Sequence, residues 1–158
     1  MKIGVLSDTH IRTMPLELEN VLLKHLSDAD IILHAGDVVE MEALKIFQSH
    51  ELYLVTGNMD SGEIKEINPW KRVISVGAFK IGMIHGWGSP SGMEQRIQGE
   101  FEDVDCIVFG HTHNPFNRRI GKTLFFNPGS PTDKRFAKVN SLGVLTVNDV
   151  LLGEIIYL

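Results

Sequence analysis

The stretch KIGVLSDTH, residues 2–10, carries the pattern that defines the fold. Residues 2–7 predict a short buried strand, because an apolar run rich in Val, Ile and Leu is bounded by polar residues. The strand ends in Ser7, Asp8, Thr9 and His10, which combine small residues with a carboxylate and an imidazole. The sequence therefore predicts a strand whose end carries chemically active side chains.

Four further apolar strands end in the same kind of feature, a small residue beside Asp, Asn or His. These endings are AGD at residues 35–37, TGN at 56–58, HG at 85–86 and GHTH at 110–113. In an α/β sheet, ligands bind outside the carboxyl ends of the strands, so side chains far apart in sequence converge there. We expect the polar residues of the five endings to form one site.

The first half of the chain alternates short strands with segments of helical spacing, which is typical of an α/β fold. Strands are predicted at residues 31–34 and 52–55, and helices at residues 15–26 and 41–49. Strands that are joined through a helix pair in parallel by right-handed crossovers. This half therefore predicts a largely parallel sheet.

The second half changes character. Residues 72–76 and 79–84 flank Gly77 and Ala78, a spacing that predicts an antiparallel hairpin. The other predicted elements are a helix around residues 92–101 and strands at residues 105–109, 123–126, 141–147 and 151–157. We expect mainly antiparallel pairing here. The predicted fold class is α/β, a two-sheet β-sandwich of mixed strands flanked by helices in a single domain over residues 1–158, with a doubly wound sheet as the alternative.

Composition limits the functions that fit. The 158 residues include 15 Lys and Arg against 20 Asp and Glu, a formal charge of −5. This balance, without a basic cluster, argues against a stable complex with long nucleic acids, although a local positive site can still bind phosphate. No apolar run reaches the ~18 residues of a membrane span, and residues 1–8 become acidic too early for a signal peptide. We expect a cytoplasmic protein with no membrane partner, in which Cys106 is a buried hydrophobe.

Two pairs of polar residues have the spacing i, i+2. Because side chains alternate between faces in extended backbone, Asp8 with His10, and His111 with His113, can each form a chelating arm. Mixed imidazole and carboxylate ligands suit Mn, Fe, Ni, Co or Zn, whereas Ca and Mg prefer oxygen. Seven ligands are too many for one ion, but two ions about 3.5–4 Å apart that share a carboxylate would use them. The seven are Asp8, His10, Asp37, Asn58, His85, His111 and His113.

Each of these residues also has a plainer interpretation. A single His after a strand is usually hydrogen bonded, a Gly-Asp pair is usually a turn, and an Asn before a loop is usually a cap. Together, however, they would require five unrelated coincidences at corresponding strand ends, which favours a shared site. His25 and His50 lack such a setting and are expected at the surface, and His34 is expected to pack within its strand.

With these motifs in order, the chain resembles the calcineurin-like metallophosphoesterases, and among them the small single-domain phosphodiesterases related to the retromer scaffold subunit. The resemblance covers nearly the whole chain and implies a β-sandwich flanked by helices. The segment NPGS, residues 127–130, is similar to a loop near the site of the small phosphodiesterases. The implied ligand sets are Asp8, His10, Asp37 and His113 for one ion, and Asp37, Asn58, His85 and His111 for the other, with Asp37 bridging.

The expected function is metal-dependent hydrolysis of a small phosphodiester by a water or hydroxide that bridges two divalent ions. Two such ions, less the charges of Asp8 and Asp37, leave a positive centre that suits an anionic substrate. Manganese is the expected metal, with nickel, iron, cobalt and zinc as alternatives. Asp37, Asn58 and His85 are the expected catalytic residues.

Met59 departs from the family pattern. Many members follow the ligand Asn with a His that contacts the phosphate and is placed to protonate the leaving group, and the small phosphodiesterases often have Cys there. A thioether has no proton to give, and the nearby Asp60 would need a raised pKa to donate one. We therefore expect activated aryl diesters to react faster than alkyl monoesters.

Substrate contacts are expected from Arg12, Asn58 and Trp87, with a solvated loop arginine and exposed loop packing as the plainer interpretations of Arg12 and Trp87. Lys134 and Arg135 are expected to help to attract anions. Two other functions stay open, a protein-interaction scaffold like the retromer relative and a metal-free α/β binding domain. The complete set of ligands argues against the scaffold, and a homo-oligomer stays open.

Overall fold

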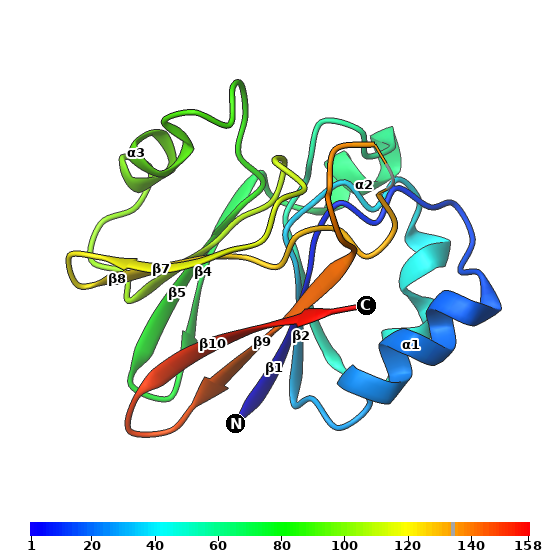
Figure 1. Ribbon diagram of the computed structural model, residues 1–158, viewed down its shortest axis with the longest axis horizontal. Coiled ribbons are helices and arrows are strands. Elements are labelled where there is room, and N and C mark those ends of the chain that lie inside the picture. The colour runs from blue at the N-terminus through cyan, green and yellow to red at the C-terminus, as the bar shows by residue number, and fades with distance from the viewer. Residues whose placement is uncertain (134) are drawn as a thin grey trace.

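Parallel pairing at the amino-terminal end builds the first of two sheets in this computed structural model, which describes residues 1–133 and 135–158 (Figure 1). The strand order is β10-β9-β1-β2-β3. Strands β1, β2 and β3 are parallel, as predicted, and β9 and β10 extend the sheet antiparallel beside β1. The strands are β1 (Lys2–Leu6), β2 (Ile31–His34), β3 (Glu51–Leu54), β9 (Ser141–Val147) and β10 (Leu151–Tyr157). Lys134 lies outside the described residues.

The second sheet has the order β4-β5-β6-β8-β7. The predicted hairpin is confirmed, because β4 and β5 pair antiparallel. The expectation of mainly antiparallel pairing is wrong for β6, which runs parallel to both β5 and β8. The chain reverses twice through β7 before it forms β8, so β8 returns in the direction of β6. The strands are β4 (Lys71–Val76), β5 (Phe79–Ile84), β6 (Cys106–Val108), β7 (Phe116–Ile120) and β8 (Thr123–Asn127).

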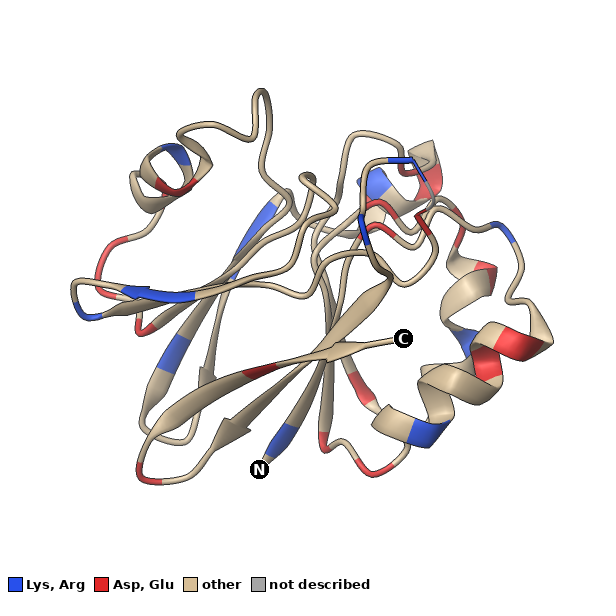
Figure 2. Cartoon of the chain, in the orientation of Figure 1, with Lys and Arg blue, Asp and Glu red and all other residues tan. Residues whose placement is uncertain are grey.

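Helices cover the outer face of each sheet, which confirms the predicted sandwich flanked by helices. Leu22 and Leu26 of α1 (Leu16–Leu26) pack on the outer face of the first sheet, together with the 3₁₀ helix (Met41–Phe47) and α2 (Gly62–Ile67). Helix α3 (Met93–Gln98) packs on the outer face of the second sheet. Basic residues are spread over β1, β4, β5, β7 and the helices (Figure 2).

Side chains along β1 alternate between the core and α1. Ile3 and Val5 point into the core between the sheets, whereas Gly4 faces α1. A Cβ at Gly4 would lie 2.8 Å from Ile32 Cδ1 and 2.9 Å from Leu26 Cδ2. Helix α1 can therefore pack this close only because residue 4 has no side chain. The missing side chain at Gly4 thus lets α1 pack closely against β1 and β2.

Three elements differ from the prediction. Residues 41–47 form a 3₁₀ helix and not an α-helix, and this short segment buries three apolar side chains under the sheet. Helix α2, with six residues capped by Ser61, and strand β7, whose residues are nearly all exposed, were not predicted. Within the described part of the chain, none of the helices combines the length and apolar character that a bilayer crossing requires.

Candidate metal centre

Loops that follow five strands meet at one end of the sandwich. Asp8 N–H donates to the carbonyl of Gly36 at 3.0 Å, and Gly110 N–H donates to the carbonyl of His85 at 3.0 Å. These backbone hydrogen bonds join the end of β1 to that of β2 and the end of β6 to that of β5. The structure therefore brings the predicted strand ends together, with Asn58 following β3 and His111 and His113 following β6.

One group of candidate ligands consists of Asp8, His10 and His113. His113 Nε2 lies 3.3 Å from Asp8 Oδ1 and 3.2 Å from His10 Nε2. His10 Nε2 lies 3.9 Å from the same Asp8 oxygen. Two imidazoles and a carboxylate thus aim nitrogen and oxygen atoms at a common point, as in sites for borderline divalent metals.

A second group consists of Asp8, Asp37 and His85 and shares Asp8 with the first. His85 Nε2 lies 3.3 Å from Asp37 Oδ2 and 3.9 Å from Asp8 Oδ1. Asp37 Oδ2 also lies 3.7 Å from His10 Nε2, so each of the two carboxylates lies next to imidazoles of both groups. Five of the seven predicted ligands therefore form two adjoining groups.

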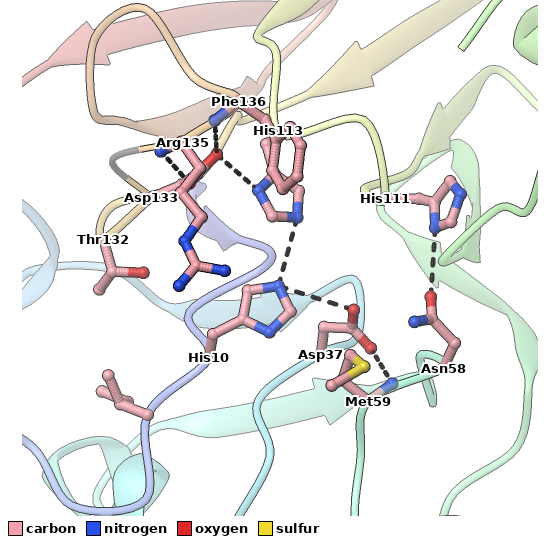
Figure 3. Close-up of a pocket in the computed structure, with 11 residues that line it drawn as sticks. His10, Asp37, Asn58, Met59, His111, His113, Thr132, Asp133, Arg135 and Phe136 are labelled. Atoms are coloured by element: carbon pink, nitrogen blue, oxygen red, sulfur yellow. Dashed lines mark hydrogen bonds and ion pairs between the residues drawn. The ribbon is translucent and has the colours of Figure 1, made fainter. Parts of the chain in front are cut away.

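Asn58 and His111 lie outside these two groups, at the rim. His111 Nδ1 lies 3.2 Å from Asn58 Oδ1, and His111 Nε2 lies 3.0 Å from the carbonyl of Gly88 (Figure 3). The His111 ring stands edge to face with that of His85, with 5.3 Å between the ring centroids. Both side chains are thus beside the second group, and their predicted roles as ligands stay predictions.

The explanation of the i, i+2 pairs by extended backbone is wrong. Most of the site residues have a left-handed backbone, which a non-glycine residue adopts only at a cost of order 1–3 kcal/mol. His111 and His113 consequently turn to different neighbours, Asn58 and Asp8, and do not form one chelating arm. The positive φ angles are 53° at Asp8, 47° at His10, 58° at Asp37, 68° at His111 and 57° at His113.

Two glycines let backbone and carboxylate come close. A Cβ at Gly57 would overlap Asp37 Oδ1 and lie 2.5 Å from the backbone nitrogen of Asp37. A Cβ at Gly110 would overlap Ser7 Oγ and lie 2.7 Å from Asp8 Oδ2. The glycines before Asn58 and His111 thus leave room for the two buried carboxylates.

Within the described residues, the two buried carboxylates have histidines as neighbours but no Lys or Arg. No Lys or Arg side chain of the described residues lies within 4.0 Å of Asp8 or Asp37, and imidazoles are their charged neighbours. Burial opposes the charge of Asp37, but the imidazole of His85, the backbone amide of Met59 and the imidazole of His10 together outweigh it and lower the pKa of this carboxyl. The hydrogen bond to Asp8 raises the pKa of His113 to about 9. The site therefore demands positive charge, which protonated imidazoles or a divalent cation supply.

His85 gives an independent test of whether a cation fits. Its Nδ1 lies 2.7 Å from the carbonyl of Ala35, which can only accept, so Nδ1 carries a proton. Its Nε2 is buried, has no hydrogen-bond partner among the described residues, and faces Asp37. A ring oriented by a backbone carbonyl, with the other nitrogen turned to carboxylates, is the usual arrangement of a metal-binding histidine.

Asp60 organises the site but is not placed as a proton donor. Its Oδ2 accepts backbone hydrogen bonds from Asp37 at 3.1 Å and Gly57 at 2.7 Å, and its Oδ1 accepts one from Val39 at 2.8 Å. Val39 has a φ of 87°, which is rare for a β-branched residue. Three backbone N–H groups therefore donate to the Asp60 carboxylate, which the sequence analysis considered as a substitute proton donor. This carboxylate acts as an acceptor.

The predicted NPGS loop lies beneath the first group. Asn127 Nδ2 donates to the carbonyl of Gly110 at 3.0 Å, and Ser130 Oγ donates to the carbonyl of Asp8 at 2.7 Å. Thr132 Oγ1 donates to the carbonyl of Thr9 at 2.7 Å. The loop thus supports the strained turn that presents Asp8 and His10, a role that its sequence alone did not specify.

His34 packs within its strand, as expected. It is buried, and its Nε2 lies 3.2 Å from Thr9 Oγ1. Burial lowers its pKa to about 4, so the ring is neutral near pH 7. Its contact with Thr9 supports the loop that follows β1, and it belongs to neither group of candidate ligands.

A cavity of about 690 Å³ opens over the site (Figure 3). Arg135, which was expected to help to attract anions, forms part of its wall, and so does Phe136, which the sequence did not single out. Arg12 lies elsewhere, in a separate hollow with Glu40, Glu42 and Glu63, and Trp87 is not part of the wall. The lining residues are His10, Ile11, Asp37, Asn58, Met59, His111, His113, Thr132, Asp133, Arg135 and Phe136.

Comparison with known proteins agrees with this class of fold and site, a β-sandwich with carboxylates and imidazoles at its strand ends. Residues 1–150 match the model of the calcineurin-like phosphoesterase superfamily domain. The chain therefore belongs to the calcineurin-like phosphoesterase superfamily, which confirms the resemblance seen in the motifs. The superfamily implies divalent metal ions, and the buried carboxylates and the oriented His85 fit them.

Three similar proteins place the chain further. A probable metallophosphoesterase of Methanocaldococcus jannaschii is 35% identical over 160 residues, which cover 99% of this chain and 81% of the relative. A phosphodiesterase of the same organism is 27% identical over 143 residues, covering 82% of this chain and 83% of the relative. The structure of Vps29 from Entamoeba histolytica complexed with Zn²⁺ has a TM-score of 0.75 and 24% identity over 99% of each chain, which shows a shared fold.

The close approach at Gly57 gives a test of this geometry. We expect Gly57→Ala to lower the free energy of unfolding by about 1–3 kcal/mol, because its Cβ would displace Asp37. The control is Gly62→Ala at the start of α2, where nothing lies within 4 Å of an added Cβ and a small stabilisation of about 0.4–1 kcal/mol is expected. Urea denaturation measures both, and equal stability of the two variants would contradict the packing at Gly57.

Proposed function

We propose that this chain is a metal-dependent phosphodiesterase that hydrolyses P–O bonds of small phosphodiesters with two divalent ions, manganese being the expected metal. One observation carries the proposal: two groups of metal-capable side chains, which share Asp8, adjoin a single cavity. Membership of the phosphoesterase superfamily and the relatives that are named metallophosphoesterases and a phosphodiesterase support the same reaction.

The residues divide the work by depth. Asp8, Asp37 and His85 are buried and would hold the ions from the protein side, and His10 and His113 are less buried and line the cavity together with Asp37. When bound, divalent ions lower the pKa of water toward neutrality and withdraw charge from phosphoryl oxygens. The remaining predicted ligands, Asn58 and His111, also line the cavity and would complete the set.

Among the described residues, Arg135 is the basic residue best placed to contact the substrate. It belongs to the cavity wall, and in Figure 3 its guanidinium extends toward His10. No ion pair within the described residues involves it, so the guanidinium is available for a phosphate oxygen. The sequence favoured Arg12, which lines a different hollow beside three glutamates. We therefore assign the phosphate contact to Arg135.

Met59 determines which esters react well. Its backbone N–H donates to Asp37 Oδ1 at 2.7 Å, while its side chain is 57% exposed at the cavity wall. The thioether offers no proton, and the carboxylate of Asp60 is held by backbone amides. A leaving group that needs no protonation, such as an aryl oxide, suits this wall.

A protein-interaction scaffold is the second candidate function. The observation in its favour is the fold that this chain shares with Vps29, at a TM-score of 0.75. That Vps29 structure is a complex with Zn²⁺, so metal binding by itself does not separate the two functions. Turnover of a phosphodiester does separate them, because a scaffold needs none.

The first functional prediction concerns Asp37. With Mn²⁺, Ni²⁺ or Zn²⁺, the protein should hydrolyse bis(4-nitrophenyl) phosphate, and Asp37→Ala should lose at least about 100-fold in kcat/KM, because a ligand next to both ion sites is removed. Asp149→Ala, in the exposed turn before β10, is the control. Retained turnover in Asp37→Ala refutes the assigned role. Fewer than about one ion per chain after Mn²⁺ loading, measured by elemental analysis, favours a metal-free binding domain.

The second prediction concerns the leaving group. The wild-type protein should cleave an aryl diester faster than an alkyl monoester, and Met59→His should accelerate an alkyl diester by about 100-fold, because an imidazole supplies the missing proton. The aryl diester should change by less than about 3-fold, since its leaving group needs no acid. Initial rates on matched esters measure this, and wild-type rates that are equal for the alkyl monoester and aryl diester sink the idea.

The third prediction compares the two arginines. Arg135→Ala should raise KM for bis(4-nitrophenyl) phosphate by about 10-fold with little change in kcat, because a charge-assisted hydrogen bond to the substrate is lost. Arg12→Ala, which removes the contact favoured by the sequence, should change KM by less than about 2-fold. The reverse order of effects in steady-state kinetics would return the phosphate contact to Arg12.

A further inference from the structure

Asp133 connects the loop before β9 to the first group of candidate ligands. Its Oδ2 lies 2.7 Å from His113 Nδ1 (Figure 3). The same oxygen accepts backbone N–H groups from Phe136 at 3.0 Å and Ala137 at 2.8 Å, and Oδ1 accepts that of Arg135 at 2.7 Å. The backbone of the loop therefore fixes the orientation of the Asp133 carboxylate independently of its contact with the imidazole.

The proton between Asp133 and His113 is on the imidazole. The Asp133 carboxylate accepts the backbone N–H groups of Arg135, Phe136 and Ala137, so it acts as a hydrogen-bond acceptor throughout this loop. An ionised carboxylate can only accept, so Nδ1 carries the hydrogen and Nε2 is directed to Asp8 Oδ1, at 3.3 Å. The Phe136 ring packs edge to face against His113, with 5.6 Å between centroids, and limits its rotation.

Neither backbone nor strand pairing orients His113 by itself. It has a left-handed φ of 57° and lies in the loop between β6 and β7. The orienting partner of His85 is the carbonyl of Ala35, whereas that of His113 is a carboxylate from a distant segment. A charged acceptor also makes the far nitrogen more basic, which a carbonyl does less strongly.

We propose that Asp133 is a positioning residue for His113: it holds the Nδ1–H tautomer and directs Nε2 toward the group formed with Asp8 and His10. This inference rests on the proposed metal centre. Asp133 has no hydrogen bond to Asp37 or His85, so its effect is confined to one of the two ion sites. One step of metal binding should therefore respond to Asp133 and the other should not.

The experiment is a calorimetric titration of the metal-free protein with Mn²⁺. Asp133→Ala should weaken one binding step by about 10- to 100-fold and leave the other within about 3-fold of wild type, the usual effect of removing a partner of a metal-binding histidine. In the Zn²⁺-loaded, ¹⁵N-labelled wild type, the Nδ1–H of His113 should give a slowly exchanging, downfield proton signal. Asp133→Ala should lose that signal.

Two further variants separate positioning from loop stability and from charge. Asn140→Ala removes hydrogen bonds from Asn140 Nδ2 to the carbonyls of Ser130 and Asp133, which loosens the same loop without touching His113. It should keep both the affinity and the signal. Asp133→Asn keeps an oxygen acceptor without the charge, so it should keep the signal and bind with intermediate affinity.

The outcomes distinguish a positioning role of Asp133 from an effect of loop stability and from failure of the proposed metal centre. If Asp133→Ala binds both ions like wild type or keeps the Nδ1–H signal, the positioning role is wrong. If Asn140→Ala weakens binding as much as Asp133→Ala does, loop stability explains the effect and the inference is overturned. If Asp133→Ala does not fold, loss of the signal in Asp133→Asn overturns it, and retention supports it. A wild-type protein that binds no Mn²⁺ overturns the proposed metal centre itself.

Discussion

The burial of two carboxylates that have no Lys or Arg partner among the described residues is the constraint on which the rest of the site depends. Asp8 and Asp37 are buried at the ends of neighbouring parallel strands, where an unpaired charge costs several kcal/mol. Backbone amides from other loops offset part of that free-energy cost by hydrogen bonding. His111 N–H donates to Asp8, and Met59 N–H donates to Asp37. The loops after β3 and β6 are therefore held over the carboxylates by the charge they help to stabilise.

Convergence of the strand ends was predictable from sequence, whereas the conformation of each turn was not. Parallel pairing forces the ends of β1, β2 and β3 to one edge, so apolar runs with polar endings sufficed to group Asp8, Asp37 and Asn58. The i, i+2 spacing of the histidines fits either extended or left-handed backbone. Tertiary hydrogen bonds select the left-handed form, and this sends His111 and His113 to different neighbours.

The elements that sequence did not reveal are those stabilised by neighbours more than by their own pattern. Strand β7 is almost entirely exposed, so it shows no apolar alternation, and it exists because its backbone pairs with β8. Because β7 lies between β6 and β8 in the sequence, β8 runs parallel to β6. This direction could not be predicted without knowing that β7 exists. The role of Asp133 could not be predicted for a similar reason. The sequence around it is typical of a polar turn, and only the fold brings its carboxylate to His113.

The cost of this arrangement bears on function. Buried ion groups can often be replaced by apolar side chains with no loss of stability, and five non-glycine site residues have a left-handed backbone that opposes folding. A surface that only holds a partner protein would require neither feature, because shape and exposed side chains would suffice. Buried carboxylates, a histidine nitrogen without a partner and strained turns are together explained by the binding of cations behind an open cavity. The physical chemistry of the site thus favours bound cations over an interface that is built from shape and exposed side chains alone.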